Sequence, residues 1–119
     1  MAQATVIIER RKKKMEALYK KLEFILTKED IERIEFRMLD EKEVITVDLH
    51  KLKVKEAKRL IGNIIAVNRN KFTLACNHGY NHGTAIKKMI CCEFENNRIE
   101  KKTGPAYNPG LTELLIKAA

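Results

Sequence analysis

The sequence predicts an α+β protein, a two-layer sandwich in which two helices cover a four-stranded mixed sheet. An amphipathic helix pattern at 52–68 lies between two apolar, β-branched runs at 44–50 and 72–76, which is typical of a strand–helix–strand unit. Two further segments of strand length follow, at 98–103 and 111–116. The predicted order of elements is therefore βαβαββ.

An N-terminal helical hairpin is predicted ahead of this sheet, so that residues 1–43 form an extension and residues 44–119 the domain. Residues 5–26 repeat apolar side chains at helix–helix spacing, and Thr27 opens a second helix, to residue 39, with a sequence close to a capping box. The apolar positions of the two helices are Met15, Leu18, Leu22, Ile25, Ile31, Ile34, Met38 and Leu39. The hairpin either packs on the domain or pairs two copies of the chain.

Within the domain, the helix at 52–68 has the clearest periodicity. Its apolar residues form one stripe that would meet a sheet: Ala57, Leu60, Ile61, Ile64 and Ile65. A second helix is predicted after Gly83, with Ile86, Met89, Ile90 and Phe94 facing inward. Residues 98–103 alternate Ile99 with charges, as an edge strand does, and 104–110 form a loop before the last strand.

Composition limits the class of protein. A chain of 119 residues has the length of one domain, with or without an appendage, and it has no apolar run long enough to span a membrane. The N-terminus lacks the order of a signal peptide, because Val6-Ile7-Ile8 is short and precedes the basic run. Three cysteines, with Cys91 and Cys92 adjacent, make no disulfide framework. We therefore expect buried, reduced thiols in a cytoplasmic protein.

The net charge of +8 is unevenly distributed. Residues 1–43 contain 11 Lys/Arg and 10 Asp/Glu, whereas residues 44–119 contain 13 and 6. The excess therefore belongs to the predicted domain and favours a polyanionic partner. The basic run at 10–14 is equally well explained as a phosphate-contacting arm or as a solvated helix face.

The predicted strand–helix–strand unit makes the strands at 44–50 and 72–76 parallel, so their carboxyl ends lie at the same edge of the sheet. His50 follows the first end and His78 the second, so that the two histidines can face one another. In open α/β sheets this edge is where ligands bind. We expect the functional site there.

Asp48 and His50 are two residues apart on an extended segment, which points their side chains to one face. A carboxylate at Asp48 can accept a proton from one ring nitrogen of His50 and so fix the tautomer of the other. The alternative is that Asp48 only holds the loop through backbone hydrogen bonds.

The segment from His78 to Thr84 has the composition of a sharp turn into a helix, where free N–H groups make an anion site. Tyr80 can stack on a base or be idle, and His82 can simply precede the helix. The predicted phosphate-binding residues are Gly79, Tyr80, Asn81, His82, Gly83, Lys87 and Lys88.

This set of residues suits phosphodiester cleavage. One histidine of the pair His50 and His78 would act as the base and the other as the acid, while N–H groups or lysines stabilise charge on the phosphate. On RNA the 2′-OH can be the nucleophile, so that no metal is required. A metal site built from Asp48, His50 and His78, holding Mg²⁺ or Mn²⁺, is the second alternative.

Four features together resemble the Smr (small MutS-related) domain. They are Val47-Asp48-Leu49-His50, the crossover helix with Glu56-Ala57, the His78-Gly79…Gly83 turn, and the late Asn108…Gly110 before a last strand. The resemblance covers about residues 44–117. It implies a fold similar to the C-terminal domain of a bacterial translation initiation factor. It also implies nicking or RNA-cleaving activity, some of it on ribosome-bound RNA, and binding of branched DNA.

The family's Leu-Asp-Leu-His-Gly motif maps onto Val47 through Lys51 and implies roles in cleavage for Asp48 and His50. Its His-Gly-x-Gly turn maps onto His78 through Asn81. Lys51 replaces the first motif's glycine and can help to bind a phosphate, while Asn81 replaces the turn's second glycine.

The resemblance predicts a stand-alone endonuclease or nickase acting on RNA or on branched or nicked DNA, with the ribosome as a further candidate partner. The N-terminal helices would either dock the domain on a partner or pair two copies of the chain as a homodimer. One alternative is a non-catalytic nucleic-acid- or ribosome-binding module that uses the same basic edge. The other is a protein-interaction adaptor in which the 5–39 hairpin is the functional part.

Overall fold

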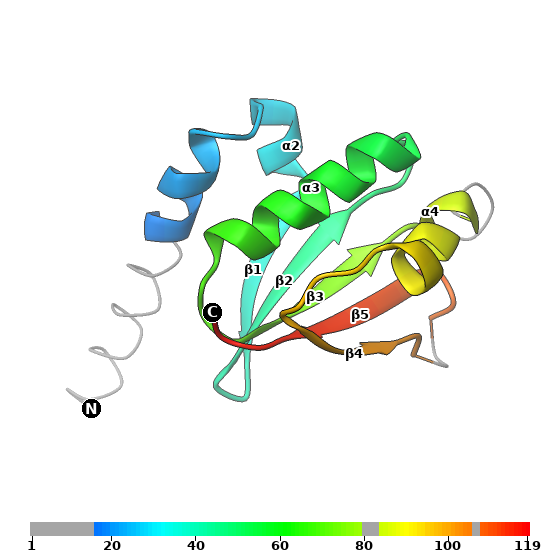
Figure 1. The fold of residues 1–119 in the computed structure, drawn as a ribbon. Coiled ribbons are helices and arrows are strands. Elements are labelled where there is room, and N and C mark those ends of the chain that lie inside the picture. Colours follow the sequence, from blue (N-terminus) through cyan, green and yellow to red (C-terminus); the bar gives the residue numbers. More distant parts are fainter. Residues whose placement is uncertain (1–15, 80–83, 106–107) are drawn as a thin grey trace.

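The computed structural model describes residues 16–79, 84–105 and 108–119 (Figure 1). It is an α+β fold with one five-stranded mixed sheet in the order β1-β2-β3-β5-β4. After a helical segment at 16–23, the elements are α2 (Lys28–Glu32), β1 (Ile34–Leu39), β2 (Lys42–Asp48), α3 (Val54–Val67), β3 (Phe72–Asn77), α4 (Thr84–Lys88), the π-helical turn η1 (Met89–Glu93), β4 (Ile99–Thr103) and β5 (Leu111–Ile116). The α+β class is confirmed, but the sheet has five strands where four were predicted.

The additional strand is β1, which the sequence analysis assigned to a helix. Thr27 does cap a helix, since its Oγ1 accepts a hydrogen bond from the Asp30 N–H, but α2 ends at Glu32. Inward and exposed residues then alternate along β1, and β1 pairs antiparallel with β2. The helical prediction for 34–39 is therefore wrong, and the predicted domain boundary at residue 43 falls inside a hydrogen-bonded hairpin.

The β1–β2 hairpin turns through two residues, Asp40 and Glu41, whose φ angles are +50° and +66°. Two-residue hairpin loops with both φ positive are the favoured kind, but they normally carry glycine or asparagine. An L-residue in this conformation costs about 1 kcal/mol. The turn contains no glycine, so its sequence lacks the Asn-Gly or Asp-Gly signal of a two-residue hairpin.

We expect Glu41→Gly to raise the free energy of unfolding by about 0.5–1 kcal/mol, because glycine removes the strain of the positive φ. Urea unfolding followed by circular dichroism measures the change. Glu41→Ala is the matched control, since alanine loses the same side chain but keeps the strain. Equal stabilities for the two variants would contradict this explanation of the turn.

One face of the sheet is covered and the other is open. Figure 1 shows α3 and α4 on the same side of the sheet. Along β2 and β5, buried residues alternate with partly exposed ones, so only the helix-facing side chains are fully enclosed. All five predicted stripe residues of α3 are buried, as are the four predicted inward residues of the α4–η1 segment. The predicted two-layer core is confirmed at these positions.

Some details of the helices differ from expectation. Leu18 and Leu22 join the main core, while Ile25 is 46% exposed, so the described part of the first helix has no separate helix–helix seam. Cys76 is buried as expected, but Cys91 and Cys92 are exposed on η1. Met15 and the basic run at 10–14 lie outside the described residues. No helix in the described part of the chain is long and apolar enough to cross a membrane.

Candidate functional site at the carboxyl edge of the sheet

The predicted parallel pairing of the two central strands is confirmed. β2 and β3 run in the same direction, with Asp48 opposite Asn77, and the Leu49 N–H continues the pairing by donating to the Asn77 carbonyl at 2.8 Å. His50 and His78 therefore leave the sheet at the same edge, where α3 and α4 begin.

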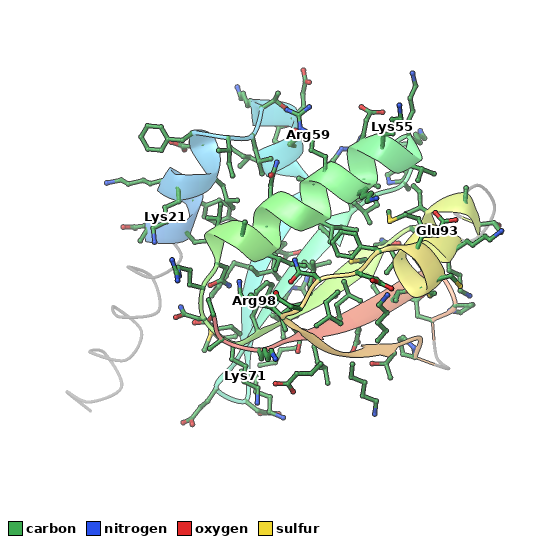
Figure 2. All side chains as sticks on the ribbon, viewed as in Figure 1. Lys21, Lys55, Arg59, Lys71, Glu93 and Arg98 are labelled. Carbon is green, nitrogen blue, oxygen red and sulfur yellow. The ribbon has the colours of Figure 1, made fainter. Side chains whose placement is uncertain are left out.

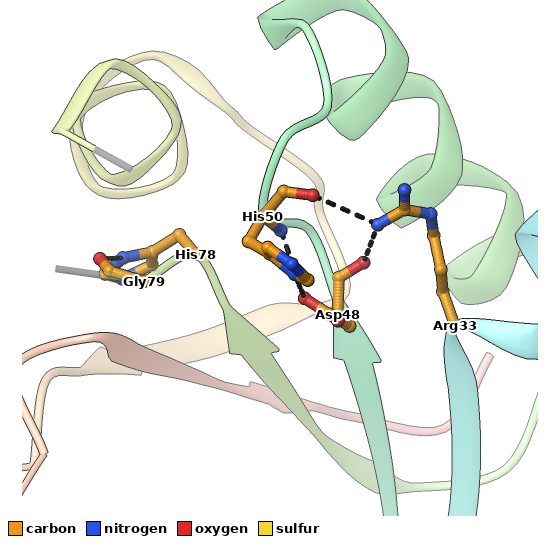
Figure 3. Close-up of polar contacts among 5 residues, drawn as sticks. All are labelled: Arg33, Asp48, His50, His78 and Gly79. Atoms are coloured by element: carbon orange, nitrogen blue, oxygen red, sulfur yellow. Dashed lines mark hydrogen bonds and ion pairs between the residues drawn. The ribbon is translucent and has the colours of Figure 1, made fainter. Parts of the chain in front are cut away.

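The side chains of Asp48 and His50 form a hydrogen-bonded pair at this edge (Figure 3). The Asp48 Oδ1 accepts from His50 twice, from the ring Nδ1 and, at 3.1 Å, from the backbone N–H. The side chains of His50 and Asp48 are 50% and 39% exposed. Asp48 thus both orients the imidazole and closes the loop, two roles that were predicted as alternatives.

The pairing determines the proton arrangement of the neutral ring. A carboxylate only accepts hydrogen bonds, so Nδ1 must carry the proton that it donates to Asp48. Nε2 is then the nitrogen with a free lone pair, and it has no hydrogen bond to another described residue. Half-exposed and held in one tautomer, His50 can accept a proton from a bound molecule at Nε2.

Arg33 holds the same loop from the side of β1 (Figure 3). Its Nη1 donates to the carbonyls of Asp48 and His50, at 3.1 Å each. The Arg33 carbonyl in turn accepts the Asp48 N–H at 2.9 Å. Arg33 was not among the predicted site residues, because residues 27–39 were predicted to be a helix of a separate extension.

His78 does not face His50. It is 1% exposed, and its ring nitrogens contact the Gly79 carbonyl (Nδ1, 3.1 Å) and the Thr112 hydroxyl (Nε2, 2.9 Å). The carbonyl accepts from Nδ1–H, so in the neutral ring Nε2 accepts from the hydroxyl. Figure 3 shows the ring pointing away from the pair. The structure therefore does not bring the predicted acid–base pair together.

Strand alternation explains this orientation. Asp48 is paired with Asn77, which is exposed on the open face of the sheet. The next residue, His78, falls on the opposite face, beside the buried Thr112 of β5. Both histidines are at the predicted edge, but they are on different faces of it.

The pKa of His78 is lowered, mainly because the ring is buried. Two smaller effects act in opposite directions: the hydrogen bond to the Gly79 carbonyl raises the pKa, and the positive charge of Lys87 lowers it. An unfolded chain therefore binds this proton at a higher pH than the folded protein does. We expect the free energy of unfolding to fall as the pH drops below about 6.5, the ordinary histidine value. Urea unfolding from pH 7.5 to 5 measures this slope, which should be shallower in His78→Gln. An equal slope in the two proteins would contradict the role given to His78.

Two residues with positive φ shape the backbone around His50. Gly79 has φ +80°, and a Cβ added there would lie 3.9 Å from the Cβ of His50. Lys51 has φ +68°, so the lysine adopts the left-handed conformation that glycine adopts most easily. The chain therefore leaves β2 by a glycine-like turn although it carries an exposed lysine there.

The remaining predicted phosphate-binding residues are only partly described. Lys87 and Lys88 are exposed in the last turn of α4. Tyr80, Asn81, His82 and Gly83 lie outside the described residues. The anion site predicted for this turn therefore stays a prediction.

A hollow of about 580 Å³ opens beside the pair, on the side of α2 and β1. Its lining residues are Glu29, Glu32, Arg33, Ile34, Glu35, Thr46, Asp48, His50 and Asn77. This side of His50 is acidic, whereas three exposed lysines follow His50 along the chain: Lys51, Lys53 and Lys55. Another hollow, of about 550 Å³, lies at the opposite end of the sheet around Met38 and Phe72, and it contains no histidine.

The alternative metal site does not assemble. His78 turns both ring nitrogens toward protein groups, so Asp48 and His50 are left without the third predicted ligand. Within residues 16–79, 84–105 and 108–119, no cluster of three or more His, Cys, Asp or Glu side chains is arranged to hold a metal ion.

Comparisons with protein-family models, with curated proteins and with solved structures found no match for this chain.

Proposed function

We propose that this protein binds nucleic acid and cleaves phosphodiester bonds in RNA or structured DNA, as an Smr-like endonuclease. The observation that supports the proposal is the Asp48–His50 pair. It places a half-exposed imidazole, held in one tautomer, at the sheet edge where ligands bind in α/β folds. General bases in enzymes are most often histidines oriented by a neighbouring acceptor in this way.

On RNA, His50 Nε2 takes the proton of the 2′-OH, and the 2′ oxygen forms a new bond to phosphorus. The bond from phosphorus to the 5′ oxygen breaks, and the leaving oxygen takes a proton from water. Asp48 stabilises the imidazolium formed at His50 through the proton on Nδ1. Lys51 is next in the chain and supplies a positive charge for the phosphate.

Exposed lysines around the edge supply affinity that does not depend on sequence. Lys51 and Lys53 precede α3, Lys55 lies in the first turn of α3, and Lys87 and Lys88 end α4. Figure 2 shows Lys55 and Arg59 on the outer side of α3. We propose that the nucleic-acid strand reaches His50 from the side of these lysines, because the carboxylates that line the hollow repel phosphate. Binding should weaken steeply as the salt concentration rises.

The test is cleavage of end-labelled RNA and of supercoiled DNA by the purified full chain, with and without EDTA. We expect RNA products that end in a 2′,3′-cyclic phosphate and a 5′-OH, formed in EDTA as well as without it. Cleavage abolished by EDTA would replace the 2′-OH mechanism with one that uses Mg²⁺ or Mn²⁺. Absence of cleavage on both nucleic acids would overturn the proposed activity.

A second candidate function is nucleic-acid or ribosome binding without cleavage. The orientation of His78 favours it, because the acid of the predicted acid–base pair is buried and does not reach the edge. Salt-dependent binding of RNA by a protein that cuts neither substrate would establish this alternative. Pairing of two copies through the N-terminal helices is compatible with either function. The molecular mass of the protein in solution tests whether the chain forms a dimer.

A further inference from the structure

We infer that Arg33 is the positioning residue of the Asp48–His50 pair. Its expected effect on cleavage rests on the proposed function, but its effect on the histidine ring does not. Arg33 hydrogen-bonds to the backbone carbonyls of Asp48 and His50, and it acts through the backbone that carries the two side chains.

Three hydrogen bonds connect Arg33 with the end of β2. Two run from Nη1 to the carbonyls of Asp48 and His50, and the third runs from the Asp48 N–H to the Arg33 carbonyl. Arg33 is itself fixed as the C-cap of α2, where its N–H donates to the carbonyls of Asp30 and Ile31. One guanidinium nitrogen therefore holds the two residues of the pair at a set separation.

The pair needs such support because its own contacts are local. Asp48 and His50 are two residues apart, so the contact between carboxylate and ring depends on the shape of the turn between them. That turn continues into Lys51, a non-glycine residue with φ +68°. On the other side, Gly79 presents only a backbone without a Cβ toward His50. The charged hydrogen bonds from Arg33 are the stronger restraint.

Part of the predicted N-terminal extension thereby supports the candidate site. Arg33 precedes residue 44, so a chain that began at the predicted domain boundary would carry Asp48 and His50 without their support. The segment ahead of β2 that contains Arg33 therefore fixes the geometry of the candidate site, in addition to the partner docking predicted for the extension.

The experiment compares Arg33→Met with Arg37→Met in the full chain. Arg37 is a matched control, since it is an exposed arginine on β1 that pairs with Glu35. Nitrogen-15 NMR of the His50 ring, at a pH where the ring is neutral, reports which nitrogen carries the proton. We expect the Nδ1–H form in the wild type and in Arg37→Met, and a mixture of both forms in Arg33→Met. In the cleavage assay kcat should fall about 10–100-fold with KM nearly unchanged.

An unchanged ring tautomer in a folded Arg33→Met protein would overturn the inference. If Arg33→Met does not fold, Arg33→Gln decides. The glutamine amide ends two bonds short of the position of Nη1, so it should hold neither carbonyl and should move the ring toward the mixture. A wild-type tautomer in Arg33→Gln would also overturn the inference. Failure of the wild type to cut RNA would remove the proposed activity but leave the NMR comparison intact.

Discussion

Replacing Asp48 by asparagine should slow RNA cleavage by about 10²–10⁴-fold, the range expected when a general base loses its function. The side-chain amide can donate as well as accept a hydrogen bond. It therefore allows the His50 tautomer with the proton on Nε2, which cannot accept the substrate's proton. Single-turnover cleavage of labelled RNA measures the chemical step, and filter binding measures affinity separately.

The control for this substitution is Glu35→Gln, which removes one negative charge from the same hollow without touching His50. We expect its cleavage rate to stay within about twofold of the wild type. Equal losses of cleavage rate in Asp48→Asn and Glu35→Gln would mean that the removed negative charge, and not the tautomer of His50, causes the loss. A fully active Asp48→Asn protein would contradict the role of the pair.

Arg98→Met should lower the free energy of unfolding by about 3 kcal/mol, since hydrogen bonds to charged groups are each worth about 1.5–3 kcal/mol and part of this site is open to water. The guanidinium joins the end of α3 to the end of the chain (Figure 2). Its nitrogens donate to the carbonyls of Ile65, Asn68, Asn70 and Lys117. Methionine keeps the stem but leaves all four carbonyls without this donor.

Urea unfolding monitored by circular dichroism measures this loss. Arg59→Met, an exposed arginine on α3, is the matched control and should change stability by less than about 0.5 kcal/mol. Arg98→Lys should recover less than half of the loss, because a lysine has one donor nitrogen where this arginine uses three. An Arg98→Met protein as stable as Arg59→Met would contradict the structural role of Arg98.

The parts of the fold that were predicted from the sequence are those with a strong period. The stripe on α3 repeats every three to four residues over a helix of 14 residues, and all of its members are buried. β2 and β3 are apolar runs on either side of it, which is sufficient to predict parallel pairing. The edge that carries Asp48 and His50 follows from this pairing alone.

The errors arise where a short pattern fits two structures. Ile31, Ile34 and Met38 have helical spacing, but Ile34 and Met38 are also compatible with the period of a strand, and the hairpin turn contains no glycine to decide between them. The orientation of His78 depends on whether the strand places Asn77 or His78 on the open face, which the sequence does not reveal. The position of Arg33 depends on the pairing of β1 with β2. Because β1 was predicted to be a helix, the contact of Arg33 with the site could not be predicted either.

The most direct test of the Asp48–His50 pair is the rate of RNA cleavage by the wild type and by His50→Ala, at equal concentrations and with binding measured in parallel. If His50 is the general base, the wild type cuts while His50→Ala binds RNA with similar affinity and cuts at least about 10²-fold more slowly. Cleavage by His50→Ala at the wild-type rate would contradict the central claim.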